Sequence, residues 1–260
     1  MSAQLKSSTV DQTLILTISN PESRNALGPE ICGAGIEALN VAESSRDIHS
    51  VIITGEGSSF CSGGNLQRLL GNREKAPEVQ SQSIDGLHNW MEVIRSFPKP
   101  VIASVEGAAA GAGFSLALMC DFVVAASDAV FVMAYSNIAL SPDGGGSWSL
   151  GKQLPRQLSS QILMLGEKVS AQQLHKWGVI NSITDPGQAF NKALELAERL
   201  NQRAPNSLAS IKELLNESQE LHLNQHLRQE RDQFVKNLHH PNSGIGIQAF
   251  FDKTKPNYKE

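Results

Sequence analysis

The sequence predicts an α/β fold, with an α/β core over residues 1–190 and a helical region over residues 191–260. Two observations predict it. Through the first half, short apolar runs rich in β-branched residues alternate with helical periodicity, which is typical of a largely parallel sheet covered by helices. After about residue 158 the patterns typical of strands become few, and amphipathic helical segments take their place.

The predicted strands and helices of the core alternate along the chain. Strands are expected at 14–19, 50–57, 100–107, 121–127 and 129–134, where apolar and β-branched residues cluster. Helices are expected at 28–44, 83–97 and 113–120. The polar stretch 73–83 has no strong pattern, and we expect a loop or the start of a helix there.

The second half of the chain is expected to be helical. A short helix begins after Ser170, a residue type that favours N-caps, and stops at Gly178. Three longer amphipathic helices follow at 187–203, 206–218 and 220–238. Their apolar faces, for example at Leu194, Ala197 and Leu200, exceed what one small core would cover. We therefore expect this region to mediate self-association.

Composition and charge exclude several classes of partner. With 40% hydrophobic and 18% charged residues among 260, the chain has the composition of an ordinary globular protein. A net charge of −4 without a long basic run argues against nucleic acid as a partner. The most apolar stretch, 114–127, is interrupted by Asp121 and is too short to span a bilayer, so no membrane partner is expected.

The cysteines and the N-terminal segment indicate the compartment. Cys32, Cys61 and Cys120 are far apart and odd in number, and no C-x-x-C spacing occurs, so we expect reduced thiols and no metal site. Residues 1–20 contain no apolar core long enough for a signal peptide. The expected location is the cytoplasm.

Two glycine-rich segments, 58–66 and 106–121, each follow a predicted strand and lead toward a helix. Their small residues would leave backbone N–H groups near Ala112 and Gly113 free to face a ligand, where the helix dipole adds positive potential. Two such turns facing each other would form an oxyanion hole, a pair of donors around one developing negative oxygen. Close packing of a helix on a strand is the alternative explanation of these glycines. Neither segment matches a phosphate-binding loop.

Five motifs occur in order along nearly the whole chain. They are ISNPESRNAL (18–27), FCSGGNL (60–66), PKPVIASVEGAAAGAGFSLALMCDFVVAA (98–126), IALSPDGGGSW (138–148) and LGEKVSAQQLHKWGVINSI (165–183). The tail FFDKTKPNY (250–258) fits the same pattern. Together they resemble the enoyl-CoA hydratase/isomerase (crotonase) superfamily, and five ordered motifs are far more specific than one glycine turn.

The resemblance implies a spiral of ββα units with a C-terminal helical region that assembles trimers, often as dimers of trimers. It implies an acyl-CoA thioester substrate, which carries its own coenzyme A, and no further cofactor. The oxyanion hole would be formed by the N–H groups of Gly64 and Ala112. Most members have glycine where Ala112 stands, but the donor is backbone, so alanine can serve if its Cβ points away.

The acidic positions separate the activities within this superfamily. Its hydratases use two glutamates to activate water, and the resemblance places these at Ser115 and Tyr135, neither of which is acidic. Asp143, in the turn SPDGGGSWS (141–149), falls where several isomerases keep their acid. Such an acid beside a thioester oxyanion hole can take a proton from C2 and return it at C4, which moves a double bond.

We therefore expect an acyl-CoA isomerase with Asp143 as acid and base. The turn is most similar to those of the phenylacetyl-CoA ring-epoxide and Δ3-Δ2-enoyl-CoA isomerases, which implies a place in fatty acid or aromatic acid catabolism. The alternative is a purely structural role for Asp143, as a turn residue or a helix cap.

Three other functions stay open. The family label also covers enoyl-CoA hydratases. Aryl-CoA dehalogenases carry a nucleophilic aspartate at the Asp143 position and a histidine base that would fall at His88, although their tryptophan at the Tyr135 position is absent. A lone histidine on a helix is more often structural. The third possibility is a non-catalytic CoA-binding member of the family.

The resemblance also implies substrate contacts. Arg24 falls in a motif whose basic residue contacts CoA phosphates, and Lys253 matches a lysine that reaches the CoA 3′-phosphate, sometimes across a subunit boundary. Arg68 lies one place past the usual basic position, and Asn65 replaces a common aspartate. The expected substrate and CoA contacts are Arg24, Ser62, Asn65, Leu66, Arg68, Tyr135 and Lys253.

Overall fold

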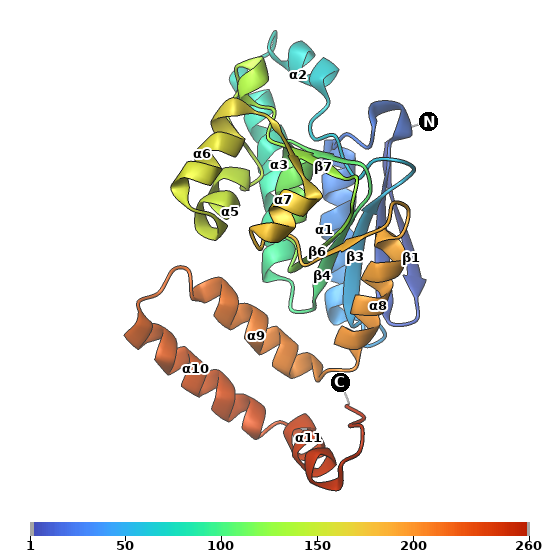
Figure 1. Ribbon diagram of the computed structural model, residues 1–260, viewed down its shortest axis with the longest axis vertical. Helices are drawn as coiled ribbons and strands as arrows, with labels where there is room; N and C mark the ends of the chain where they lie inside the picture. The colour runs from blue at the N-terminus through green and yellow to red at the C-terminus, as the bar shows by residue number, and fades with distance from the viewer. Residues whose placement is uncertain (1–2, 259–260) are drawn as a thin grey trace.

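The computed structural model describes residues 3–258 and confirms the α/β fold (Figure 1). Its main sheet has six strands in the order β1-β2-β3-β4-β6-β9, with β1 antiparallel to β2 and the other neighbours parallel. The strands are β1 (Gln4–Val10), β2 (Thr13–Ser19), β3 (Ser50–Gly55), β4 (Val101–Val105), β6 (Phe122–Ala126) and β9 (Ser182–Thr184).

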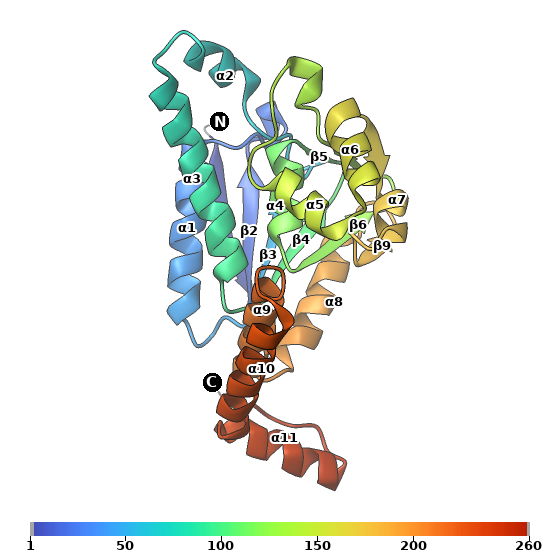
Figure 2. The same ribbon diagram turned by 90° about the vertical axis from the view of Figure 1, so that its left-hand side faces the viewer.

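Helices cover both faces of this sheet (Figure 2). They are α1 (Pro29–Ser44) and α3 (Pro77–Ser96), which lie together on one face, and α8 (Ala189–Asn201), which covers the other. Because side chains alternate along a strand, Leu16 and Ile53 join the core on the α1 side, whereas Ile15 and Ile52 pack against Ala193 of α8. Burial on both faces explains why these strands are nearly continuous apolar runs.

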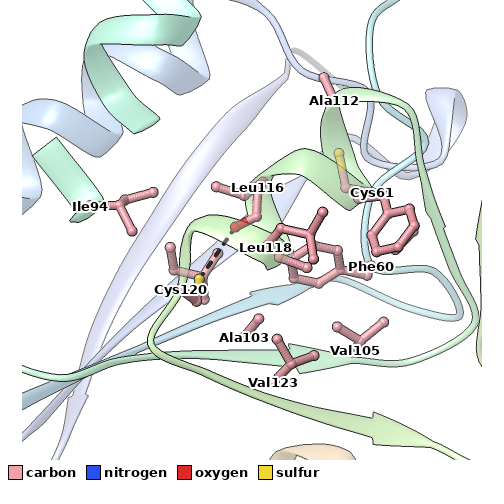
Figure 3. Close-up of a cluster of buried hydrophobic side chains, with 14 of the residues drawn as sticks. Phe60, Cys61, Ile94, Ala103, Val105, Ala112, Leu116, Leu118, Cys120 and Val123 are labelled. Atoms are coloured by element: carbon pink, nitrogen blue, oxygen red, sulfur yellow. Dashed lines mark hydrogen bonds between the residues drawn. The ribbon is translucent and has the colours of Figure 1, made fainter. Parts of the chain in front are cut away.

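A second sheet, of three strands, lies beside the first and leads into the buried helix α4. The sheet comprises β5 (Ala108–Ala110), β7 (Val130–Val132) and β8 (Lys168–Ser170), and α4 is Ala112–Met119. α4 is apolar on nearly all sides, as expected for a central helix. Figure 3 shows Leu116 and Leu118 of α4 close to Phe60, Val105 and Val123 of the surrounding segments. The core therefore fixes the position of the helix N-terminus at Ala112.

The last three helices, α9 (Pro205–Glu217), α10 (Leu223–Leu238) and α11 (Pro241–Asp252), extend away from the core (Figure 1). The boundary expected at residue 190 falls inside α8, and the apolar face of α8 is buried on the chain's own sheet, so Ala197 is fully buried there. The apolar side chains left exposed instead lie on α9 to α11. Within residues 3–258, no helix combines the length and apolar character needed to cross a membrane.

The five predicted strands are confirmed, and several elements were missed. β1 is polar and exposed, and β5, β8 and β9 have three residues each, so neither alternation nor length identified them. α3 begins at Pro77, within the stretch left open as a loop or helix start. The helices that remain are α2 (Leu66–Asn72), α5 (Gly146–Gln153), α6 (Arg156–Leu165) and α7 (Ala171–Lys176), with short 3₁₀ turns at Pro21–Ser23 and Ser136–Ile138. Ser170 caps α7 as predicted.

Candidate active site

A pocket of about 540 Å³ opens between α2, α3 and the turns that follow β5 and β7. Its walls are mainly apolar, with side chains that include Leu66, Leu69, Ile84, Leu87, Ile138 and Leu140. Backbone of the two glycine turns and the side chains of Tyr135, His88 and Asp143 supply polar groups. A concave apolar pocket with a few convergent polar groups is the usual form of a small-molecule site.

The two glycine turns lie against each other at this pocket. Isolated β-bridges join Gly64 to Leu27 and Cys61 to Ala109, which fixes the first turn between two backbone segments. A methyl group on Gly63 would lie 2.6 Å from the carbonyl oxygen of Ala110 and 3.2 Å from the nitrogen of Ala112. Only glycine therefore allows this approach, and Gly63 also has a positive φ of 89°.

Gly64 and Ala112 both line the pocket, and neither amide N–H has a hydrogen-bond partner among residues 3–258. Ala112 is the first residue of α4, where the helix dipole adds positive potential. Ala112 as a whole residue is 3% exposed and belongs to the hydrophobic core, so its small methyl group takes little space from the pocket. Two free amides at this place can bind one carbonyl oxygen.

Asp143 lies across the pocket on the turn before α5, and its carboxylate contacts Tyr135. Oη of Tyr135 donates a hydrogen bond of 2.5 Å to Oδ1 of Asp143. Burial and the negative charge of Asp143 both raise the pKa of Tyr135, with burial the larger cause, so the phenol stays protonated. Tyr135 was expected to contact substrate; it lines the pocket and also holds the acid.

The backbone of the Asp143 turn is held from two sides. Oγ of Ser115 donates to the carbonyl oxygen of Asp143 at 3.0 Å, and the N–H of Gly144 lies 3.3 Å from Nε2 of His88 as a donor. Gly144 and Gly146 pack on α4, where an added methyl group would lie 3.1 Å from Cβ and 2.5 Å from Oγ of Ser115, respectively. Ser115 is fully buried and supports the turn from behind.

Comparisons with known proteins identify the family. The model of the family described as Enoyl-CoA hydratase/isomerase matches residues 9–260. The chain belongs to this family. It is similar to the 1,2-epoxyphenylacetyl-CoA isomerase of Escherichia coli strain K12, with 34% identity over 247 residues and 94% of each chain covered. It is 31% identical over 248 residues to the 2,3-dehydroadipyl-CoA hydratase of that strain, with 95% of each chain covered.

A solved structure gives the same result for the fold. The crystal structure of an enoyl-CoA hydratase from Polaromonas sp. JS666 is 65% identical, with a TM-score of 0.98, and the match covers 98% of this chain and 100% of that one. The crotonase-type fold of the enoyl-CoA hydratase/isomerase family is thus confirmed. Relatives carry isomerase and hydratase names alike, so the choice between these reactions rests on the residues of the site.

The other residues predicted for the site of this family member separate into two groups. Ser62, Leu66 and Arg68 line the pocket, together with His88. Asn65 does not line it; its side chain caps α2 by accepting from the N–H of Arg68 at 3.0 Å. The amide oxygen of Asn65 is thus engaged in the start of α2, and a contact of Asn65 with substrate stays a prediction.

Arg24 and Lys253 lie outside the pocket lining. Arg24 is exposed, and its carbonyl oxygen accepts from the N–H of Ser62 at 3.0 Å, so it lies next to the rim. Lys253 follows α11, on the part of the chain that extends away from the core (Figure 1). In one copy of the chain Lys253 is therefore remote from the pocket, and a role toward CoA requires a neighbouring copy.

Most apolar residues of the pocket wall were not predicted from the sequence, and one polar residue, Cys32, was missed as well. Cys32 of α1 lines the pocket, and burial raises the pKa of its thiol to about 11 against the opposing effect of Arg68. The motif containing it carries no signal for a ligand contact, because a cysteine at a helical core position is usually structural. Its place in the pocket depends on how α1 packs beneath the glycine turns.

Proposed function

We propose that the chain is an acyl-CoA isomerase that shifts a double bond, or rearranges a ring epoxide, by proton transfer through a thioester enolate. The amide groups of Gly64 and Ala112 hold the thioester oxygen, and Asp143 moves the proton. The substrate supplies the coenzyme A, so the proposal requires no further cofactor.

The observation that carries this proposal is the placement of a single acid. Among the described residues that line the pocket, Asp143 is the only Asp or Glu, and it shares the pocket with the two free amides. Hydrogen bonds from the two amides stabilise negative charge on the thioester oxygen, and this makes the neighbouring C–H bond more acidic. One carboxylate can then accept the proton at one carbon and return it at another.

The structure also supports an isomerase over a hydratase. A hydratase of the family would place glutamates at positions 115 and 135. Ser115 is fully buried and does not line the pocket, while Tyr135 is a neutral donor to Asp143. Neither can activate water as a carboxylate does. The similarity to a protein named 1,2-epoxyphenylacetyl-CoA isomerase is consistent with this choice and with an aryl or enoyl acyl group.

One specific observation favours a second candidate function. His88 lines the same pocket, and its Nε2 lies 3.3 Å from the N–H of Gly144, next to Asp143. A carboxylate with a nearby histidine base can act as a nucleophile and be released by water. This is the arrangement of a dehalogenase or hydrolase. In this structure, however, His88 accepts from backbone and so serves the turn.

The deciding experiment compares acyl-CoA substrates and one matched pair of variants. Purified enzyme is incubated with crotonyl-CoA, a 3-enoyl-CoA, an aryl-CoA epoxide and a halogenated aryl-CoA, and products are identified by mass spectrometry. We expect isomerisation, with hydration of crotonyl-CoA far slower. Asp143→Asn keeps the shape and should lower the isomerase rate by at least ~10²–10⁴-fold.

The control variant is Asp128→Asn, which changes an exposed aspartate in the turn between β6 and β7. It should retain the wild-type rate. Calorimetry with a non-reactive acyl-CoA should show that Asp143→Asn still binds. A robust hydratase rate in Asp143→Asn, or isomerisation within a few-fold of wild type, would exclude the proposed mechanism.

A further inference from the structure

The Asp143 carboxylate has a single side-chain partner in the part of the chain that the structure describes. That partner is the hydroxyl of Tyr135, at 2.5 Å from Oδ1. This is the short separation typical of an O–H donor to an ionised carboxylate. Across residues 3–258 no Lys, Arg or His side chain forms an ion pair with Asp143, and Oδ2 has no hydrogen-bond partner.

Tyr135 is itself firmly placed. Only 9% of its surface is exposed, and it begins the 3₁₀ turn Ser136–Ile138. Its ring packs on Gly111, where an added methyl group would lie 3.5 Å from Cζ of the ring. Because burial and the charge of Asp143 raise the pKa of Tyr135, the phenol keeps its proton and donates it in the hydrogen bond.

The contacts on the backbone of the turn do not orient the carboxylate. Ser115 binds the carbonyl oxygen of Asp143, and His88 accepts from the N–H of Gly144. Both leave the side-chain torsions of Asp143 free to rotate. Among the residues that the structure describes, the hydroxyl of Tyr135 is the one side-chain group that holds the carboxylate itself.

We propose that Tyr135 is a positioning residue that occupies Oδ1 of Asp143 and leaves Oδ2 as the one oxygen that exchanges a proton with the acyl chain. This inference rests on the proposed isomerase function. As the C–H bond of the substrate breaks, its electron pair passes into the thioester enolate and an O–H bond forms on Oδ2. The reverse step at the second carbon restores the carboxylate, and Tyr135 keeps its proton throughout.

The chain offers a matched control, because it has two tyrosines, Tyr135 and Tyr258. Tyr258 lies against Gly246 in the C-terminal region, where it lines a different pocket, so Tyr258→Phe removes the same hydroxyl far from Asp143. We expect Tyr135→Phe to lower kcat for a 3-enoyl-CoA by about 10- to 100-fold, because loss of orientation by ~1 Å can cost ~10²-fold. KM should stay near wild type, and Tyr258→Phe should behave as wild type.

The split between kcat and KM separates positioning from a structural role. A folding defect would lower the melting temperature and the active fraction, whereas loss of orientation should lower kcat at unchanged KM and unchanged melting temperature. A Tyr135→Phe variant that keeps its melting temperature and wild-type kcat would overturn the proposal.

A double-mutant cycle shows whether Tyr135 acts through Asp143. In an Asp143→Asn background the further change Tyr135→Phe should lower the residual rate by less than about two-fold, because residues that act as a unit are not additive. Equal fold losses in both backgrounds would give Tyr135 an independent role and overturn the proposal.

A measurement without substrate tests the contact between Tyr135 and Asp143 independently of the proposed isomerase activity. In a Tyr258→Phe background Tyr135 is the only tyrosine, and the Cζ resonance of ¹³C-labelled tyrosine reports on the hydrogen bond of its hydroxyl. Adding Asp143→Asn replaces the charged acceptor of this hydrogen bond by a neutral amide and should shift the resonance. The same resonance in both proteins would overturn the contact. Wild-type enzyme without isomerase turnover would overturn the proposed function instead.

Discussion

The ammonium group of Lys212 in α9 lies 2.7 Å from the carboxylate of Asp121, the residue that precedes β6. The same nitrogen donates to the carbonyl oxygen of Ile94 at 3.0 Å, and the N–H of Val101 donates to Oδ2 of Asp121 at 2.8 Å. One ion pair therefore joins the first C-terminal helix to the ends of α3 and β4. It fixes where the extended helical region leaves the core.

Removal of this ammonium group should destabilise the protein. The Lys212 side chain is 10% exposed and that of Asp121 is 23% exposed, so the pair is neither fully buried nor on the open surface. A surface ion pair is worth about 0–1 kcal/mol. Loss of one partner of a buried pair costs about 3–5 kcal/mol. We expect Lys212→Met to lower the free energy of unfolding by about 2–3 kcal/mol.

Urea denaturation at one fixed protein concentration measures this effect, since self-association shifts apparent stability. The control is Lys192→Met, which breaks the exposed pair with Glu195 and should change stability by less than about 0.5 kcal/mol. Equal midpoints for Lys212→Met and Lys192→Met would show that the pair contributes nothing.

The thiol of Cys32 should report on occupancy of the pocket. Its pKa of about 11 leaves only about 10⁻⁴ of the group ionised near pH 7, so alkylation by iodoacetamide should be slow there. Because the folded pKa is raised, the rate should rise as pH increases toward 11. A saturating non-reactive acyl-CoA should slow the reaction, since Cys32 lines the pocket.

Peptide mass spectrometry of the alkylated protein gives the site of reaction. All three cysteines are buried, but Cys61 is fully buried and lies outside the lining of this pocket, so it serves as an internal control that should react only after unfolding. Modification of Cys61 before Cys32, or equal Cys32 modification with and without ligand, would contradict the position given to Cys32.

The helices α10 and α11 leave apolar side chains exposed that a second copy could cover. Leu227, Phe234, Phe250 and Phe251 are all exposed, and α10 has no buried residue. We propose a homotrimer or its dimer, in which Lys253 of one copy could reach the CoA of another. Light scattering at micromolar concentration should return a multiple of the 28.1 kDa chain mass.

Phe234→Glu should weaken this assembly, because a charge would enter an apolar interface. Val41→Glu is the matched control: Val41 and Phe234 are both 68% exposed, but Val41 lies on α1 of the core. Monomeric wild-type protein, or loss of assembly in Val41→Glu alone, would contradict an interface on α10.

The sequence predicted the fold class and the two glycine turns because both depend on local chemistry. Gly63 and Gly64 follow an apolar strand, and small residues at a helix start leave amides free wherever they occur. Contacts that depend on tertiary packing were not predictable. Tyr135 meets Asp143 only because the chain reverses between them, with Ala139 at a positive φ of 56°.

The same reason explains two features that the sequence did not show. The apolar face with Leu194 and Ala197 was expected to bind another subunit, but amphipathic periodicity does not say which surface an apolar face meets, and α8 meets its own sheet. The side chain of Asn65, predicted to contact substrate, also caps α2, which its place in the motif did not indicate.

Isotope labelling should separate proton transfer from nucleophilic attack by Asp143. If the carboxylate attacked the substrate, water would open the aspartyl ester at the carboxyl carbon, and turnover in heavy-oxygen water would leave heavy oxygen in Asp143. As a proton carrier, Asp143 exchanges only hydrogen and keeps both its oxygens. We therefore expect no label in the peptide that contains Asp143 after many turnovers with a 3-enoyl-CoA or after incubation with a halogenated aryl-CoA, whose halide can leave on attack. A label on Asp143 with the halogenated substrate would assign the nucleophilic mechanism.

The variant His88→Gln also tests whether Asp143 transfers a proton or attacks the substrate, because the nucleophilic mechanism needs His88 as the base for water. Glutamine has a carbonyl oxygen that can accept from the N–H of Gly144, as His88 does at 3.3 Å, but it cannot act as a base for water. If His88 only supports the turn, isomerase turnover should fall by no more than a few-fold. Loss of activity on the order of 10²–10⁴-fold, the usual worth of a general base, would instead place His88 in the chemistry. His88→Phe, which has no acceptor for Gly144, should be more impaired than His88→Gln if His88 supports the turn. The turn that carries Asp143 then loses one of the two side-chain hydrogen bonds to its backbone.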